Sequence, residues 1–313
     1  MSATALSAAT AATAAAASTR HRSPGARAGA HWSNALFIAP FLVVYGLLLV
    51  VPLAKGLWIS LQEVDMLSHS AEFVGLRNYH ELWADAIFRT AVRNTFAFVL
   101  MSTPVFVALG LALALALNRP GRVAATLRAI FFGSSVLSVT IVTLVWKLVL
   151  MPHQGLLANM THALGLPSVS LLTSETWALP MIVVVTVWWI IGLPMMLFLA
   201  ALQQIPHEVY EAAALDSASR WRTLRHVTLP AIRRTVALVA IVEVILQFQM
   251  FGQAHLMTQG GPNDSSRPIV QFIYEAGFQH WTLGYAAAAS QVLFAIMLIA
   301  MAAQVWARRK EAQ

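Results

Sequence analysis

The hydrophobic positions of the chain fall into six long stretches, separated by segments that hold most of the charged residues. The stretches are residues 35–61, 94–117, 129–150, 177–202, 235–257 and 284–307. Each is rich in Leu, Val, Ile, Phe and Ala. Each is also long enough to cross the hydrocarbon core of a bilayer, which takes about 20 residues. The pattern therefore predicts an all-α membrane protein with six transmembrane helices.

The segments between these stretches alternate in charge. Arginines gather before the first stretch, in segments 118–128 and 203–234, and after the last stretch. Segment 151–176 has no Lys or Arg, and segment 258–283 has only Arg267. Because cytosolic loops collect basic residues, we expect both termini in the cytosol, which an even number of spans also requires.

Two further segments differ from the rest. Segment 62–93 mixes acidic and basic residues, and its run from Phe73 to Tyr79 predicts a turn that leads into a short interfacial helix. Residues 1–32 begin with a run of Ala, Ser and Thr, and arginines follow that run. A secretory signal has its positive charges before the apolar run, so we favour a disordered cytosolic tail over a cleaved signal. The transmembrane domain is then residues 33–313.

Composition agrees with a membrane protein and excludes several other classes. Of the 313 residues, 58% are hydrophobic and 11% are charged, whereas about a quarter of a soluble protein is charged. The net charge of +7 fits basic cytosolic segments, so no nucleic-acid partner is expected. The chain has no cysteine and therefore no disulfide or thiolate metal site. It also lacks a phosphate-binding loop, a His-Glu-x-x-His motif and a defensible Ser/His/Asp set, so we predict no catalytic residue, no metal site and no enzyme activity.

Segment 203–234 is unlike an ordinary connector. Pro206 stands where a helix can begin, and residues 211–216 predict a short helix with an unusually small side-chain face. A turn is expected at 217–219, followed by a second short helix that Leu229-Pro230 closes before the fifth stretch. On the residues alone, this segment is either an amphipathic hairpin on the membrane surface or a docking element for a partner.

A motif in this segment resembles that of a known family. The motif is Glu211-Ala212-Ala213-x-x-Asp216-x-Ala218, followed after ten residues by Leu229-Pro230. It is similar to the EAA loop of permease subunits in binding-protein-dependent ABC importers. Further segments resemble the carbohydrate-uptake branch of maltose-type and glycerol-3-phosphate-type permeases: Gly75-Leu76-x-Asn78-Tyr79, Gly155-Leu156-Leu157-x-Asn159, Leu199-Ala200-x-Leu202-x-x-Ile205-Pro206, Thr258-x-Gly260-Gly261-Pro262 and Gly284-Tyr285-x-Ala287.

The resemblance implies a type I ABC importer permease in a bacterial inner membrane, importing a sugar, a polyol or an oligosaccharide. The implied partners are a second homologous permease, an extracytoplasmic solute-binding protein and a cytosolic ATPase dimer. ATP and Mg would be bound by that ATPase, and this chain would hold no cofactor. The alternatives are a stand-alone secondary transporter and an ABC permease for a non-sugar solute.

The resemblance also assigns residues to ATPase coupling. They are Glu211, Ala212, Ala213, Asp216, Ser217, Leu229 and Pro230. In such permeases the EAA helix docks in a cleft of the ATPase and moves when ATP closes the ATPase dimer. The family usually has glycine where this chain has Ser217. A serine forced into the left-handed region would cost about 1–2 kcal/mol, so the turn after the helix is the least typical part of the motif.

Polar residues inside the apolar stretches are candidates for the substrate pathway, because ionisable and polar groups in a membrane mark functional sites by default. In the fifth stretch the candidates are Glu243, Gln247, Gln249 and Gln253, together with Met250, which lies on the same helical stripe. In the fourth stretch they are Trp188 and Trp189. We also expect Gly192 and Pro194 to kink the fourth span. The alternative is that these polar groups bond across helices to the partner permease and that the tryptophans serve packing.

Overall fold

The computed structural model describes residues 38–65, 70–152, 154–165, 167, 170–216 and 219–311. The chain divides into two compact units, residues 1–55 and 56–313. The predicted tail, residues 1–32, lies outside the described residues. In the first unit the described chain is helical from Ile38 and passes through the π-helical turn η1 (Gly46–Val50) into α3 (Val51–Ser60). Its large apolar side chains, such as Leu48, are exposed, as expected for a helix that faces lipid.

The second unit begins with the end of α3, at Gly56, and continues into an antiparallel hairpin that the sequence pattern did not predict. Strands β1 (Gln62–Asp65) and β2 (Ser70–Phe73) pair with Gln62 opposite Phe73. The all-α prediction is wrong at this point, because four-residue strands with charged side chains show no apolar alternation to detect. The predicted short helix is confirmed as α4 (Arg77–Ala84), after Gly75, whose φ of +60° suits a residue without a side chain.

Helix α5 (Ala86–Leu117) is the longest helix of the second unit. At 1.5 Å per residue its 32 residues span about 48 Å, which exceeds the hydrocarbon core of about 30 Å. It begins earlier than the predicted stretch 94–117 because the carboxylate of Asp85 caps it, accepting hydrogen bonds from the backbone N–H of Ile87 at 2.7 Å and of Phe88 at 3.3 Å.

Two of the predicted spans are bent helix pairs. The third consists of α6 (Arg122–Ser134) and α7 (Val139–Leu150), which meet at 97°. The predicted stretch 129–150 is therefore not one continuous helix. The helix stops at Ser134, and Ser138 caps a new one, its hydroxyl accepting from the Ile141 N–H. The fourth consists of α9 (Ala178–Ile190) and α10 (Gly192–Gln203), bent by 50°. This bend confirms the predicted kink.

The remaining described elements complete the second unit. They are α8 (Leu156–Ala163), α11 (His207–Leu215), α12 (Arg220–Thr223), η2 (Leu224–Thr228), α13 (Leu229–Phe248), α14 (Gly252–Met257), α15 (Ile269–Tyr274), η3 (Glu275–Gln279) and α16 (Leu283–Glu311). The fifth predicted stretch, 235–257, is not one helix. It ends with α13 at Phe248, and a non-helical segment at 249–251 separates it from α14.

Three helices of the described chain are long and apolar enough to span a bilayer: Ile38–Ser60, Ala86–Leu117 and Leu283–Trp306. The number rises to five if each bent pair forms one span. Helix α13 does not join this set, because its 20 residues include Arg233, Arg234 and Glu243. The structure thus supports a helical membrane protein with three to five candidate spans, and the sixth span stays a prediction.

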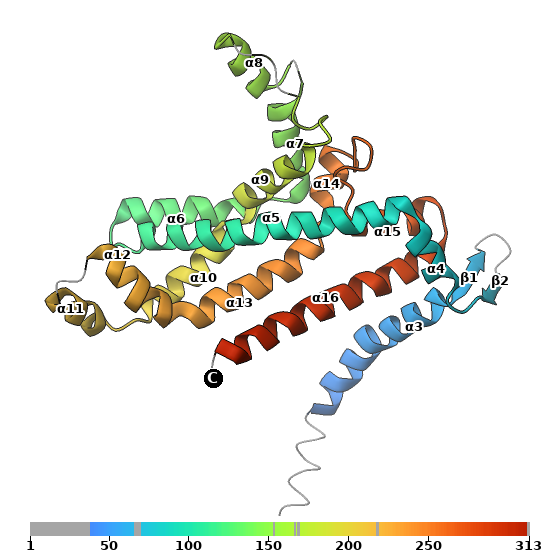
Figure 1. The fold of residues 1–313 in the computed structure, drawn as a ribbon, viewed down its shortest axis with the longest axis horizontal. Coiled ribbons are helices and arrows are strands. Elements are labelled where there is room, and N and C mark those ends of the chain that lie inside the picture. Colours follow the sequence, from blue (N-terminus) through green and yellow to red (C-terminus); the bar gives the residue numbers. More distant parts are fainter. Residues whose placement is uncertain are drawn as a thin grey trace, which may run out of the picture. The chain divides into compact units, whose positions relative to one another are not determined.

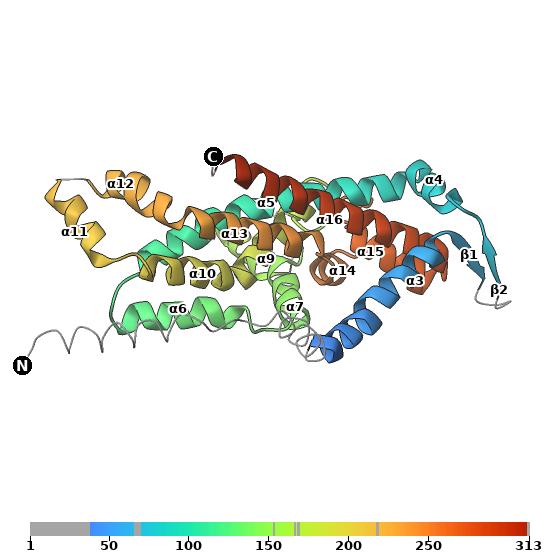
Figure 2. The same cartoon turned by 90° about the horizontal axis from the view of Figure 1, so that it is seen from below.

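Helix α5 organises the core of the second unit. In Figures 1 and 2 it lies beside α9, α10 and α13. One buried cluster forms around Phe98 and Phe106, and another around Phe198 with residues of α10 and α13. The interruptions of α6/α7, α9/α10 and α13/α14 lie in this same bundle, so the core holds three helix breaks close to one another.

Candidate functional site

Most of the residues predicted to line the substrate pathway meet at one cavity of about 540 Å³. These are Trp189, Gln247, Gln249, Met250 and Gln253. The rest of the lining comes from Ser135, Val139, Ile190, Leu193, Leu246, Phe251 and Gly252. The sequence-based assignment therefore brings Trp189 of α9 together with residues of α13, α14 and the segment between them, about 60 residues away in the chain.

The cavity lies where the helices are interrupted. Gly192 lets α6 lie close against the bend between α9 and α10, because a Cβ atom there would lie 2.2 Å from the backbone oxygen of Phe131 and 2.6 Å from the Cα of Phe132. The break is also fixed by polar contacts. The Ser134 hydroxyl donates to the backbone oxygen of Trp189 at 2.9 Å, and the Trp189 indole N–H donates to the backbone oxygen of Leu137 at 3.0 Å. These contacts hold the broken ends of two spans against each other.

Glu243 lies one helical turn behind the cavity wall. It is 2% exposed and does not line the cavity, and its carboxylate accepts a hydrogen bond from the Gln247 side-chain amide at 2.9 Å. Gln247 as a whole residue is also only 2% exposed, but it lines the cavity. Glu243 therefore supports Gln247 from behind and has no place on the cavity surface. Met250 and Gln253 are also buried.

The two adjacent tryptophans face different surroundings. Trp189 lines the cavity, whereas Trp188 is 47% exposed and packs edge-on against Trp146 of α7 at 5.5 Å between ring centroids. Neighbouring residues of a helix point about 100° apart, so both rings cannot face one cavity. Trp189 thus lines this cavity and Trp188 does not.

The chemistry of the lining suits a neutral, hydroxyl-rich solute. Glutamine amides offer both donors and acceptors, and Trp189 offers an aromatic face beside them. A mostly apolar pocket with a few convergent polar groups is the usual form of a small-molecule site.

The predicted coupling residues lie on α11 and around it. Pro206 precedes the helix as expected, and Glu208 lies in its first turn, where negative charge is favourable. Ala213 is buried, while Glu211, Ala212 and Asp216 are exposed. Within the described chain, Glu211 and Asp216 form no ion pair. The exposed face of α11 thus presents two carboxylates beside small side chains.

The segment after α11 differs from its predicted form. Ser217 lies outside the described residues, so its turn is not placed. Leu229 and Pro230 do not close the second short helix, because α12 continues through η2 into α13 with helical backbone angles throughout. A proline removes one backbone donor and crowds the preceding turn. The wider π-helical turn of η2, directly before Pro230, accommodates it and keeps the helix continuous.

Comparison with known proteins decides the family. Residues 73–312 match the family model described as "Binding-protein-dependent transport system inner membrane component". The chain belongs to this family. It is accordingly a permease component of an ABC transport system and a transport subunit, not an enzyme, as the sequence predicted. Dependence on a binding protein also excludes a stand-alone secondary transporter.

Individual permeases resemble the chain over most of its length. It is 32% identical over 277 residues to the diacetylchitobiose uptake system permease protein NgcF of Streptomyces coelicolor, covering 84% of this chain and 78% of that protein. It is 31% identical to the multiple sugar-binding transport system permease protein MsmF of Streptococcus mutans, covering 90% and 96%. The fold matches a chain of a bacterial alginate ABC transporter with a TM-score of 0.76, at 22% identity, covering 87% and 92%.

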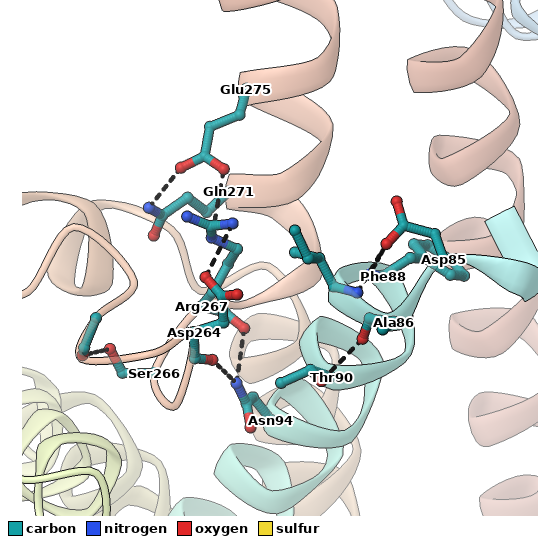
Figure 3. A network of polar contacts seen from close by, with 12 residues as sticks. Asp85, Ala86, Phe88, Thr90, Asn94, Asp264, Ser266, Arg267, Gln271 and Glu275 are labelled. Atoms are coloured by element: carbon teal, nitrogen blue, oxygen red, sulfur yellow. Dashed lines mark hydrogen bonds and ion pairs between the residues drawn. The ribbon is translucent and has the colours of Figure 1, made fainter.

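The permease also contains a polar network that the sequence analysis did not identify (Figure 3). Its centre is the loop between α14 and α15, which holds Gly260-Gly261-Pro262. The Asn94 side-chain amide of α5 donates to the backbone oxygens of Asp264 at 2.6 Å and Arg267 at 3.1 Å. Arg267 forms an ion pair with Asp264 at 3.0 Å, and its Nε lies 3.3 Å from a carboxylate oxygen of Glu275 without hydrogen-bond geometry.

This network attaches the loop to three parts of the permease. Thr95 of α5 accepts from the backbone N–H of Ile269 at 2.9 Å, and the Asn263 amide donates to Glu175 in the segment before α9. The Gln271 amide donates to Glu275 at 2.9 Å. Two sequence signals could have pointed to the network: the polar residues Asn94 and Thr95 at the start of a predicted apolar stretch, and Arg267, the one basic residue of segment 258–283.

Proposed function

We propose that this permease forms part of the pathway by which an ABC importer moves a sugar, or a related polyol or oligosaccharide, into the cell. The single observation that carries the substrate class is the cavity where three glutamines and Trp189 meet. The names of the relatives support it, since they include permeases for diacetylchitobiose, lactose and arabinooligosaccharides.

The coupling role is assigned to α11. Its exposed acidic face carries Glu211 and Asp216 without an ion-pair partner in the described chain, which suits charged hydrogen bonds to another protein. Ala212 and Ala213 let a second backbone approach closely. The helix from α12 through η2 and Pro230 into α13 is continuous, and the Tyr210 hydroxyl of α11 lies 3.4 Å from the Thr228 hydroxyl at the end of η2. We infer that a displacement of α11 is passed through this helix to Gln247 at the cavity wall.

The assembly implied by this function has several members. We propose a second homologous permease, an extracytoplasmic solute-binding protein and a cytosolic ATPase dimer that binds ATP and Mg. The chain would cross a bacterial inner membrane six times, with both termini in the cytosol. The basic segments 118–128 and 203–234 support this orientation.

The test is reconstitution. Tagged protein should copurify with an ATPase and a second permease, and proteoliposomes with the complex and its binding protein should take up a radiolabelled sugar only with ATP inside. A panel of diacetylchitobiose, lactose and arabinooligosaccharides is the starting set. Uptake of a non-sugar solute with no uptake of any sugar would overturn the substrate class, and uptake without an ATPase would overturn the coupling.

A further inference from the structure

Four aromatic rings form a continuous row that begins at the cavity. Phe251, which lines the cavity, stacks on His255 with 5.1 Å between ring centroids and 18° between planes. Tyr274 contacts both of these rings, at 5.2 and 5.4 Å. Tyr274 then stacks on Phe278 at 5.6 Å and 27°. Every ring in the row touches the next one.

The row follows from helical spacing on two elements. Phe251 and His255 stand four residues apart at α14, and Tyr274 and Phe278 stand four residues apart across α15 and η3. Residues at this spacing share one helix face. The two segments therefore each supply a pair of rings, and the pairs meet at Tyr274.

The row becomes more exposed away from the cavity. Phe251, His255 and Tyr274 are half-buried, whereas Phe278 is 66% exposed. Beyond Phe278 the chain runs directly into His280 and Trp281, which line a second cavity of about 910 Å³.

One ring of the row carries an unused polar atom. The Nδ1 atom of His255 is buried and has no hydrogen-bond partner among the described residues. Buried polar atoms are almost always paired, so an unpaired one indicates a partner that the chain itself does not provide. An imidazole nitrogen can donate to or accept from a hydroxyl group.

We propose that Phe251, His255, Tyr274 and Phe278 form an aromatic track along which the sugar moves between the outer end of the permease and the cavity. This inference rests on the proposed function and adds the residues of the route. A sugar ring presents C–H groups on its face and hydroxyls at its rim. The aromatic faces, with their negative potential, attract the C–H groups, and His255 supplies a hydrogen bond to a hydroxyl.

Phe278 is the best position for a mutational test, because its ring is exposed and contributes little to folding. Phe278→Leu keeps an apolar side chain and removes the aromatic face. An aromatic contact contributes about 0.5–1.5 kcal/mol, so in proteoliposomes with saturating binding protein we expect uptake to slow by about two- to tenfold. Phe278→Trp should keep at least half of the wild-type rate. Phe73→Leu is the matched control, because Phe73 is 60% exposed and lies outside the row, and it should leave uptake unchanged.

A second measurement separates a track from a packing role. ATP hydrolysis stimulated by the loaded binding protein should stay at the wild-type rate in Phe278→Leu, so that more ATP is used for each sugar imported. A packing defect would lower hydrolysis and uptake together. The sugar of the panel that the wild-type complex imports should, at millimolar concentration, slow the carbethoxylation of His255 by diethyl pyrocarbonate, as measured by mass spectrometry.

The outcomes distinguish the two proposals. If the wild-type complex imports a sugar of the panel while Phe278→Leu is as fast and His255 is not protected, the track is refuted and the proposed function stands. Equal losses of hydrolysis and uptake would also refute the track. If the wild-type complex imports no sugar of the panel, the proposed function fails and the track fails with it.

Discussion

Replacing Gly192 by alanine tests the account of how the cavity is built. The new Cβ would lie 2.2 Å from the Phe131 backbone oxygen, 2.6 Å from the Phe132 Cα and 2.7 Å from the Phe131 carbonyl carbon. Favourable contacts between such atoms need about 3.5–4.0 Å, so α6 and α10 would have to separate by about 1 Å. All three obstructing atoms are backbone, and no side-chain rotation can relieve the clash.

The expected cost follows from comparable overpacking. Inserting a methyl group into a closely packed contact costs about 1–3 kcal/mol, and for a chain of this size we expect the thermal midpoint to fall by about 2–10 °C. Uptake should fall as well, because the separation would strain the contacts between Ser134 and the Trp189 backbone oxygen and between Trp189 and Leu137. Those contacts shape the wall of the cavity.

Gly133 provides the matched control. It lies in α6 next to Phe132, and a Cβ there would meet nothing within 4 Å. Gly133→Ala should therefore be neutral or stabilising by up to about 1 kcal/mol, since alanine favours helix over glycine. The assay is thermal unfolding of the detergent-solubilised protein by intrinsic fluorescence, followed by uptake in proteoliposomes. Equal midpoints for the two variants would show that α6 and α10 do not approach as closely as the structure has them.

Three further predictions concern polar groups. Gln247→Leu removes the hydrogen bond to the buried Glu243 carboxylate, so it should lower the free energy of unfolding by about 1–3 kcal/mol and reduce uptake. Adding Glu243→Gln to this variant should restore the thermal midpoint. A double variant as unstable as Gln247→Leu alone would argue against the pairing. Glu211→Lys should abolish ATP-driven uptake without loss of protein from the membrane, whereas Glu208→Lys, in the first turn of the same helix, should be tolerated. Wild-type uptake by the Glu211→Lys variant would remove the docking role. Ser217→Gly should be tolerated in the same assay. Asn94→Ala breaks two hydrogen bonds to the loop between α14 and α15, and faster proteolysis within residues 258–268 should reveal the loss; an unchanged cleavage rate would mean that the loop is held by its other contacts.

The sequence predicted the parts of the fold that depend on local pattern. The apolar stretches predicted at 35–61 and 284–307 contain long helices because continuous hydrophobicity of that length has few other solutions in a membrane. The bend at Gly192 and the start of α11 after Pro206 were predicted because these residues change backbone geometry locally. The same is true of the helix that follows Gly75.

What the sequence did not reveal depends on contacts between distant segments. The hairpin of β1 and β2 is a pairing of two short polar runs, and nothing in either run indicates the other. Trp188 lies away from the cavity because it is on the face of α9 that packs against Trp146 of α7. The loop network joins Asn94 to Asp264 and Arg267 across 170 or more residues of sequence, so the Gly260-Gly261-Pro262 motif of the loop does not indicate its partner on α5.

The helix breaks explain why the cavity forms where it does. The breaks lie between α6 and α7, at Ile191, and at residues 249–251, and each contributes lining residues: Ser135 and Val139, Ile190 and Leu193, and Gln249 to Phe251. In a bilayer, non-helical backbone is tolerated only where protein covers it or where it borders a polar cavity. The apolar runs by themselves do not reveal these breaks, since the residues there are apolar or uncharged; only the bend of the fourth span was predicted, from Gly192 and Pro194. The three positions at which the apolar runs are not continuous helices are thus the positions that line the cavity.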